Sequence, residues 1–201
     1  MVRVSSHGGS VADPIVERFR GHRAGNTREL SSALESTEAI ARVVALHDGD
    51  TLTAVFDTLG GFYKIHVRLD GIDTPEINSK TPANRRVAGM ARDRLLDMIV
   101  EGTREGGTRE GGTRPRGPST NGFEAFLDGD VYLVRIQCGK CEKYGRLLGR
   151  LSSAYSDALS PSFNDRLCGE RLALRYNGGA KLTDAEQMRA MGRDETTGDL
   201  I

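Results

Sequence analysis

The chain has 201 residues, and its 28 Lys and Arg residues balance its 28 Asp and Glu residues, which leaves no formal net charge. This balance excludes a polycation that coats nucleic acid through charge alone, but it allows a local basic groove. No apolar run approaches the ~18 residues that a membrane-spanning helix requires, so we expect no membrane partner. The first thirty residues hold charged side chains where a secretory signal would need an apolar stretch, which predicts an intracellular protein.

The three cysteines are an odd number, which argues against a disulfide framework and favours a reducing compartment. Cys138 and Cys141 form a C-x-x-C pair, while Cys168 stands alone. A structural zinc site needs four ligands, and the sequence has no second pair to complete one. We therefore interpret the pair as part of a turn, and a redox or metal role stays the less favoured alternative.

Composition divides the chain into three regions. Residues 1–37 are interrupted by glycines and charges and predict a flexible tail. Residues 38–182 carry the apolar patterns of one folded domain, and residues 183–201 predict a short helix with a polar tail. Inside the domain, residues 102–122 repeat Gly-Thr-Arg with a period of five residues and have almost no apolar side chains. Such a segment cannot offset the entropy of its ordering, so we expect a mobile loop insert.

Five short runs of apolar and β-branched residues predict strands. They lie at residues 40–46, 52–56, 62–69, 131–136 and 146–151, with turns expected at Asp48-Gly49, Gly60-Gly61 and Gly139-Lys140. A helix falls between the third and the fourth strand, and further helices follow the fifth. This order is typical of a five-stranded OB-fold barrel with flanking helices, an α+β fold that is mainly β.

Periodic apolar residues and capping residues predict the helices. The longest begins after Thr81, with Pro82 in its first position, and its apolar stripe continues to about Val100. A second helix is capped by Ser162, with Asp165 in the capping-box position, and directs Phe163 and Leu167 into the core. Shorter helices are expected at residues 27–34 and 184–191.

The predicted hairpins bring charged residues together at one end of the sheet. If Gly60-Gly61 forms a two-residue turn, Thr53 lies opposite Arg68, and Asp50 lies at the same end. Asp73 follows Arg68 by five residues, across a segment dense in turn formers. We therefore expect the two carboxylates and the guanidinium to converge.

Two carboxylates this close repel each other unless a cation lies between them. Hard oxygen ligands are available from Asp50, Asp73, Glu76 and the nearby turn carbonyls. Such ligands suit Ca²⁺ best. They favour Mg²⁺ or Mn²⁺ less, and they do not suit zinc. Arg68 beside such a cation would donate to an oxyanion, most naturally a phosphate. The alternative is an ordinary loop with capped turns and a salt bridge, since Asp and Gly are common in any loop.

Three motifs, in order, carry a resemblance to a known family. They read D-G-D-T at residues 48–51, R-L-x-G-I-D-T-P-E at residues 68–76 and K-Y-G-R-x-L at residues 143–148. Together they resemble the signature of the staphylococcal nuclease (thermonuclease) family, over about residues 39–181 apart from the insert. The resemblance implies an OB-fold enzyme that uses Ca²⁺ to hydrolyse phosphodiester bonds of DNA and RNA.

The resemblance also implies a metal site. Asp50 and Asp73 correspond to carboxylates that bind the metal directly, and Thr74 corresponds to a residue that supplies a backbone carbonyl. Glu76 corresponds to the residue that holds the attacking water, either as a general base or as its orienter. In phosphodiester hydrolysis this water needs a carboxylate within hydrogen-bond reach.

Four further residues match positions that contact the substrate in the family. Arg68 and Arg146 correspond to the guanidinium groups that bind the phosphate and stabilise its transition state. Tyr144 and Tyr176 correspond to tyrosines that line the nucleotide pocket. We expect a monomer that acts on nucleic acid; the alternative is an OB-fold module that has little or no catalytic activity and binds nucleic acid or protein.

Overall fold

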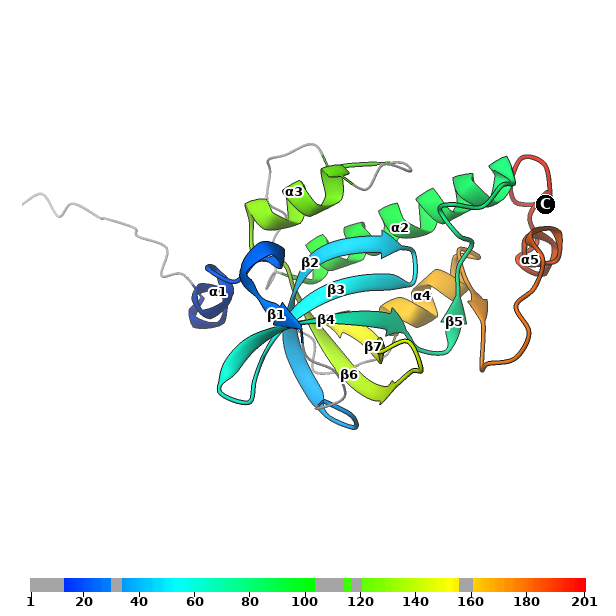
Figure 1. The fold of residues 1–201 in the computed structure, drawn as a ribbon. Coiled ribbons are helices and arrows are strands. Elements are labelled where there is room, and N and C mark those ends of the chain that lie inside the picture. Colours follow the sequence, from blue (N-terminus) through cyan, green and yellow to red (C-terminus); the bar gives the residue numbers. More distant parts are fainter. Residues whose placement is uncertain (1–12, 30–33, 104–113, 117–120, 156–160) are drawn as a thin grey trace, which may run out of the picture.

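The structure, a computed structural model, describes residues 13–29, 34–103, 114–116, 121–155 and 161–201. Within these ranges, five strands close into a barrel and five α-helices flank it (Figure 1). This is the OB-fold-like barrel of the α+β class that the sequence predicts. Its strands supply the rigid frame on which the charged residues of the three motifs are placed.

The barrel strands follow the order β4-β3-β2-β6-β7, and a parallel pairing of β7 with β4 closes the barrel. Their bounds are Glu38–Asp48 (β2), Thr51–Thr58 (β3), Gly61–Leu69 (β4), Leu133–Cys141 (β6) and Leu147–Ser153 (β7). Two very short strands, β5 (Ile72–Asp73) and β8 (Leu174–Arg175), pair with each other in a separate antiparallel sheet.

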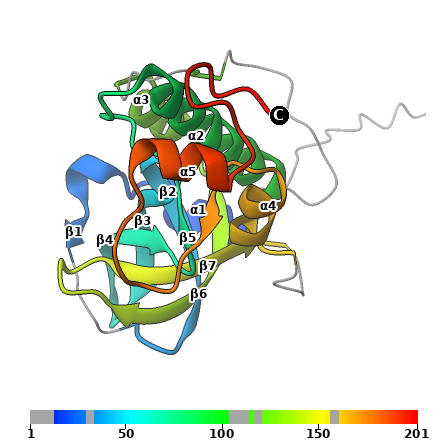
Figure 2. The same ribbon diagram turned by 90° about the vertical axis from the view of Figure 1, so that its right-hand side faces the viewer.

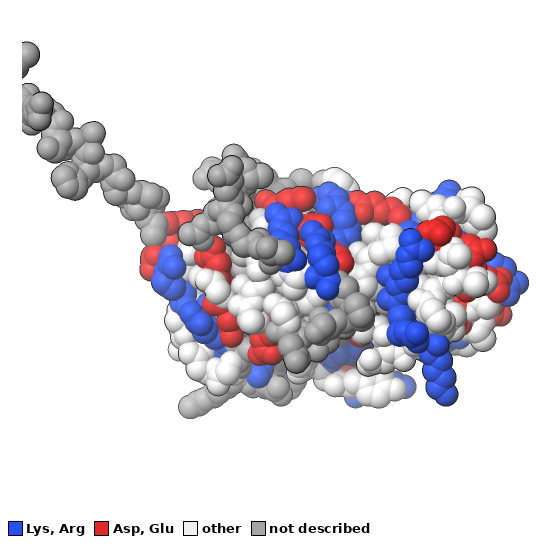
Figure 3. Space-filling view, turned by 90° about the horizontal axis from the view of Figure 1, so that it is seen from above, with Lys and Arg blue, Asp and Glu red and all other residues white. Residues whose placement is uncertain are grey.

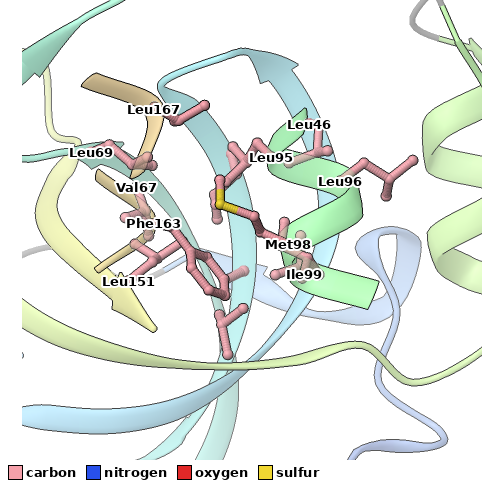
Figure 4. Close-up of a cluster of buried hydrophobic side chains, with 14 of the residues drawn as sticks. Leu46, Val67, Leu69, Leu95, Leu96, Met98, Ile99, Leu151, Phe163 and Leu167 are labelled. Carbon is pink, nitrogen blue, oxygen red and sulfur yellow. The ribbon is translucent and has the colours of Figure 1, made fainter. Parts of the chain in front are cut away.

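The helices cover the barrel and complete its core. Their bounds are Pro14–Phe19 (α1), Pro82–Gly102 (α2), Asn121–Gly129 (α3), Phe163–Gly169 (α4) and Asp184–Ala190 (α5). Figure 4 shows Leu95 and Met98 of α2 among buried side chains of the barrel strands, with Phe163 and Leu167 of α4 beside them, which confirms the predicted core positions in α4. None of the helices in the described ranges combines the length and the apolar character that a bilayer crossing requires.

The hairpin between β3 and β4 turns one residue earlier than predicted. Thr58 pairs with Gly61, so the turn is Leu59-Gly60, and Arg68 lies opposite Thr51 rather than Thr53. Leu59 has a φ of 49° and Gly60 a φ of 75°, as a type I′ turn requires, although leucine rarely adopts this conformation. The register therefore shifts by two residues. Because side chains alternate with a period of two, every side chain keeps its predicted face.

A β-bulge, not a turn, occupies the predicted turn at Gly139-Lys140. β6 continues to Cys141, and its register with β7 shifts between Cys138 and Cys141, so that three steps along β6 span two steps along β7. Both cysteines consequently face the same side of the barrel wall. The hairpin turn follows at residues 142–146, and β7 begins at Leu147.

The expected N-terminal tail is wrong for residues 13–29, which pack on the barrel. Phe19 of α1 is buried, and the centre of its ring lies 5.5 Å from that of Phe62 in an edge-to-face contact. The buried guanidinium of Arg42 donates to the carbonyl oxygen of Phe19 at 2.9 Å and so ties this segment to β2. The segment is held because it covers apolar side chains of the barrel that would otherwise face water.

A second expectation near the N-terminus is also wrong. The stretch 27–34, predicted as a helix, contains the strand β1 (Arg28–Glu29), which pairs in parallel with β4. Residues 1–12 and 30–33 of the predicted N-terminal tail lie outside the described residues, and Leu34 is buried in the core. The helix predicted at residues 184–191 is confirmed as α5, and in the polar segment after it the buried Arg193 donates to the carbonyl oxygen of Arg171 at 2.8 Å.

Most of the predicted loop insert at residues 102–122 also lies outside the described residues. Of its described part, Arg116 pairs with Asp97 of α2 at 2.7 Å. The sequence analysis missed α3, which begins inside this stretch and buries Phe123 and Leu127, four residues apart on one helix face.

The predicted capping box of α4 is confirmed. The hydroxyl of Ser162 accepts the N–H of Asp165 at 3.1 Å and itself donates to the Asp165 carboxylate at 2.6 Å. Arg150 and Arg175 each donate to the same carboxylate at 2.6 Å. The Ser162 hydrogen bond and the two arginines lower the pKa of Asp165 to about 2, although burial opposes them.

We expect Asp165→Asn to lower the free energy of unfolding by about 1–2 kcal/mol near neutral pH, since the charge supports a helix cap and two arginines. The folded-state pKa of Asp165 lies below its ordinary value of 3.8. Its stabilising effect is therefore complete above that value and is lost as the pH falls towards about 2. Urea unfolding of the two proteins should show a difference that shrinks over this range.

Glu124→Gln removes a charge from an exposed residue of α3 and serves as the control, with little expected change at any pH. A stability difference for Asp165→Asn that stays constant as the pH falls would contradict the assigned role of the charge.

Candidate active site

One guanidinium joins the two carboxylates that the sequence predicts to converge. Asp50 lies in the turn before β3, Arg68 near the end of β4, and Asp73 in β5. Arg68 Nη1 lies 3.1 Å from Asp50 Oδ2, and Arg68 Nη2 lies 2.9 Å from Asp73 Oδ1. The side chains of Asp50, Arg68 and Asp73 are 4 %, 14 % and 9 % exposed, so this charge cluster is largely withdrawn from water.

Asp50 accepts hydrogen bonds at both carboxylate oxygens. Thr51 Oγ1 donates to Oδ1 at 2.9 Å, and the backbone N–H of Thr74 donates to Oδ2 at 3.2 Å. Burial nevertheless raises the pKa of Asp50 to about 6, against the lowering effect of Arg68 and of these hydrogen bonds. The carboxylate therefore depends on a neighbouring positive charge to stay ionised near neutral pH.

Asp73 contacts two further side chains that no motif indicated. Gln187 Nε2 of α5 donates to Asp73 Oδ2 at 2.8 Å, and Lys181 Nζ lies 3.6 Å from Asp73 Oδ1. The same ammonium group forms an ion pair with Glu76. Burial works to lower the pKa of Lys181, but the hydrogen bond to Glu76 and the charges of Asp73 and Glu76 outweigh it and raise the pKa. Lys181 thus brings Glu76 into the charge cluster.

A second arginine, Arg146, directly precedes β7, the strand that pairs with β4 beside Arg68. Arg68 is opposite Leu148 of β7, and Arg146 precedes Leu148 by two residues, so both guanidinium groups leave the same face of the barrel wall. Arg146 pairs with Glu142 across the hairpin turn, and its guanidinium carbon lies 5.9 Å from the ring centre of Tyr144. The charge of Glu142 also acts on Arg68, which indicates that the two ion pairs are neighbours.

The two tyrosines that the resemblance assigns to a nucleotide pocket differ in their surroundings. Tyr144 is 70 % exposed beside Arg146, so its ring is accessible for stacking. Tyr176 donates its hydroxyl to the carbonyl oxygen of Gly179 at 2.8 Å and its N–H to that of Gly71 at 2.9 Å. These bonds shape the segment that leads to Lys181, and a role of Tyr176 in substrate binding stays a prediction.

The donor set fits a hard cation by its chemistry. Asp50 and Asp73 offer buried carboxylate oxygens, and Thr74 Oγ1 beside them is a buried oxygen with no hydrogen-bond partner in the described part of the chain. Among the described residues, however, no three acidic, His or Cys side chains are grouped as metal ligands. Arg68 lies between the two aspartates and Lys181 pairs with Glu76, so protein cations compensate these carboxylates.

No model of a protein family matches the chain, and no curated protein matches it. The assignment of the site therefore depends on its geometry and its chemistry. Sequence analysis brought Asp50, Arg68 and Asp73 together but missed Gln187 and Lys181, which lie more than one hundred residues further along the chain than Asp73. The helix predicted at residues 184–191 matches α5, but no pattern in the sequence indicates that its Gln187 reaches Asp73.

Arg68→Met should lower the free energy of unfolding by about 3–5 kcal/mol, because it leaves two buried carboxylates without their shared partner. Asp50→Asn introduced into the same chain should restore part of this loss, since it removes one of the uncompensated charges. Urea unfolding of the two single variants and the double variant measures this coupling.

Arg86→Met is the matched control, because Arg86 pairs with Asp199 at 2.7 Å where both side chains are more than half exposed. We expect it to change the free energy of unfolding by less than about 1 kcal/mol. Strictly additive effects of Arg68→Met and Asp50→Asn would show that the guanidinium does not stabilise the Asp50 charge.

Proposed function

We propose that the protein is a Ca²⁺-dependent phosphodiesterase that hydrolyses DNA, RNA or both. The observation that carries the proposal is the pair of buried carboxylates on one guanidinium, with Glu76 linked to Asp73 through Lys181. A simple salt bridge pairs one acid with one base, whereas here two buried carboxylates share one guanidinium. Such groups are suited to a reaction that develops charge on phosphate oxygens.

In this proposal, Asp50, Asp73 and the carbonyl of Thr74 would hold the cation, which when bound supplies Lewis-acid stabilisation of the phosphate. Arg68 and Arg146 would bind two phosphate oxygens from one face of the barrel and stabilise the charge of the transition state. Glu76 is more than half exposed and lies at the edge of the cluster, where its carboxylate can orient a water molecule.

Substrate binding would depend on this local cluster rather than on the overall charge. On the face shown in Figure 3, basic and acidic side chains of the described residues are interspersed and form no continuous basic surface. In this proposal, a nucleic-acid strand would be bound at the β6–β7 turn, where Tyr144 is exposed beside Arg146. The monomeric state and the intracellular location stay predictions.

One observation favours the alternative function, a binding module. Arg68 and Lys181 form ion pairs with the carboxylates, and such pairs would also be expected in a site that has lost its catalytic role. Activity decides between the two. Purified protein should cleave single-stranded or double-stranded DNA or RNA when Ca²⁺ is present, and a calcium chelator should stop cleavage. Asp50→Asn should have the same effect while the protein stays folded. An absence of cleavage on all three substrates with Ca²⁺ or Mg²⁺ would support the binding module.

Arg146→Lys should lower kcat by about 10²–10³-fold and leave the melting temperature close to that of the wild type. Lysine keeps the charge but loses the planar group that holds two oxygens at once. Single-turnover cleavage rates of folded protein measure the effect, and Arg86→Lys on the surface of α2 is the matched control. A wild-type rate for Arg146→Lys would remove Arg146 from the mechanism.

A further inference from the structure

The segment between β8 and α5 is fastened at both ends to the chain around Asp73. At its start, the N–H of Tyr176 donates to the carbonyl oxygen of Gly71 at 2.9 Å. At its end, the carboxylate of Asp184 accepts a hydrogen bond from Thr81 Oγ1 at 2.7 Å. The Thr81 side chain therefore bonds to Asp184 and does not cap the N-terminus of α2. Figure 2 shows this segment passing beside β5 on its way to α5. These two attachments position Lys181 next to the acidic cluster.

Lys181 changes the charge balance of the cluster. Asp50, Asp73 and Glu76 supply three negative charges, and Arg68 and Lys181 supply two positive charges, which leaves one net negative charge. Without the ammonium group the cluster would hold two net negative charges, the complement of one divalent cation. The ammonium contacts both Asp73 and Glu76, two of the three carboxylates that a cation would approach.

Of the two cations, Lys181 is the one that can leave. Its side chain is 44 % exposed, whereas that of Arg68 is only 14 % exposed between the aspartates. A lysine ammonium is a compact, strongly hydrated charge on a flexible stem, so water can accommodate it readily once it leaves the carboxylates. The backbone just before Lys181 has positive φ at Gly178 (89°) and Gly179 (112°), a conformation that residues with side chains disfavour.

We propose that Lys181 is a tethered counter-ion of the acidic cluster, which a hard divalent cation must displace from Asp73 and Glu76 in order to bind. The lysine thereby sets the affinity of the site for the cation and keeps the cluster compensated while no cation is bound. The identity of the cation as Ca²⁺ rests on the proposed function, but the counter-ion role itself does not.

Calorimetric titration with Ca²⁺ tests the displacement. Lys181→Gln should bind Ca²⁺ on the order of tenfold more tightly than the wild type, because a competing unit charge is gone. Lys181→Arg keeps a competing charge and should stay near the wild-type affinity. Lys140→Gln removes a charge from an exposed lysine of β6 and is the matched control.

Melting temperatures without added cation provide an independent test. Lys181→Gln should melt below Lys140→Gln, because its carboxylates lose their counter-ion, and Ca²⁺ should raise its melting temperature more than that of the wild type. If Lys181→Gln binds Ca²⁺ with the same affinity as the wild type, the displacement of Lys181 is overturned, but the proposed function is not. Failure of every variant to bind Ca²⁺ would overturn the proposed function as well. A melting temperature equal to that of the control would overturn the counter-ion role.

Discussion

The guanidinium of Arg68 between Asp50 and Asp73 is the contact on which the rest of the site depends. Two carboxylates cannot both stay charged in a buried position without a cation, and burial already raises the pKa of Asp50 to about 6. The three residues come from the turn before β3, from β4 and from β5, and Arg68 contacts both of the others. The cluster thus joins three segments at one end of the barrel.

The C-terminal part of the chain completes this cluster. β8 pairs with β5 and places Leu174 opposite Asp73, while Gln187 of α5 donates to the second oxygen of the Asp73 carboxylate. The segment between these two elements carries Lys181. A chain shortened before β8 would therefore lose the pairing of β5, one buried hydrogen bond of Asp73 and the ammonium partner of Glu76.

Local sequence signals predicted much of this fold. Alternation of apolar and polar residues placed the barrel strands, and the capping box at Ser162 placed α4, because both depend only on neighbouring residues. The turn at Leu59-Gly60 escaped prediction since a leucine with positive φ is favoured by the pairing of the whole hairpin, not by its own preference. The packing of residues 13–29 on the barrel could not be predicted locally, because Phe19 clusters with apolar side chains that are distant in the sequence, such as Leu133.

The residues of the candidate site divide in the same way, into those placed by local sequence signals and those placed by distant contacts. Asp50, Arg68 and Asp73 were predictable because one hairpin and one turn relate them. Lys181 and Gln187 were not, because their contacts with Asp73 arise from the position of a distant segment, for which a single sequence holds no periodic or motif signal.

A crystal structure of the protein with Ca²⁺ and a single-stranded oligodeoxynucleotide tests the central claim most directly. The account predicts a cation held by Asp50 and Asp73, a phosphate on Arg68 and Arg146, and Lys181 withdrawn from Asp73 and Glu76. A structure in which the nucleic acid binds elsewhere on the barrel, while Arg68 and Lys181 keep their carboxylate partners, would contradict it.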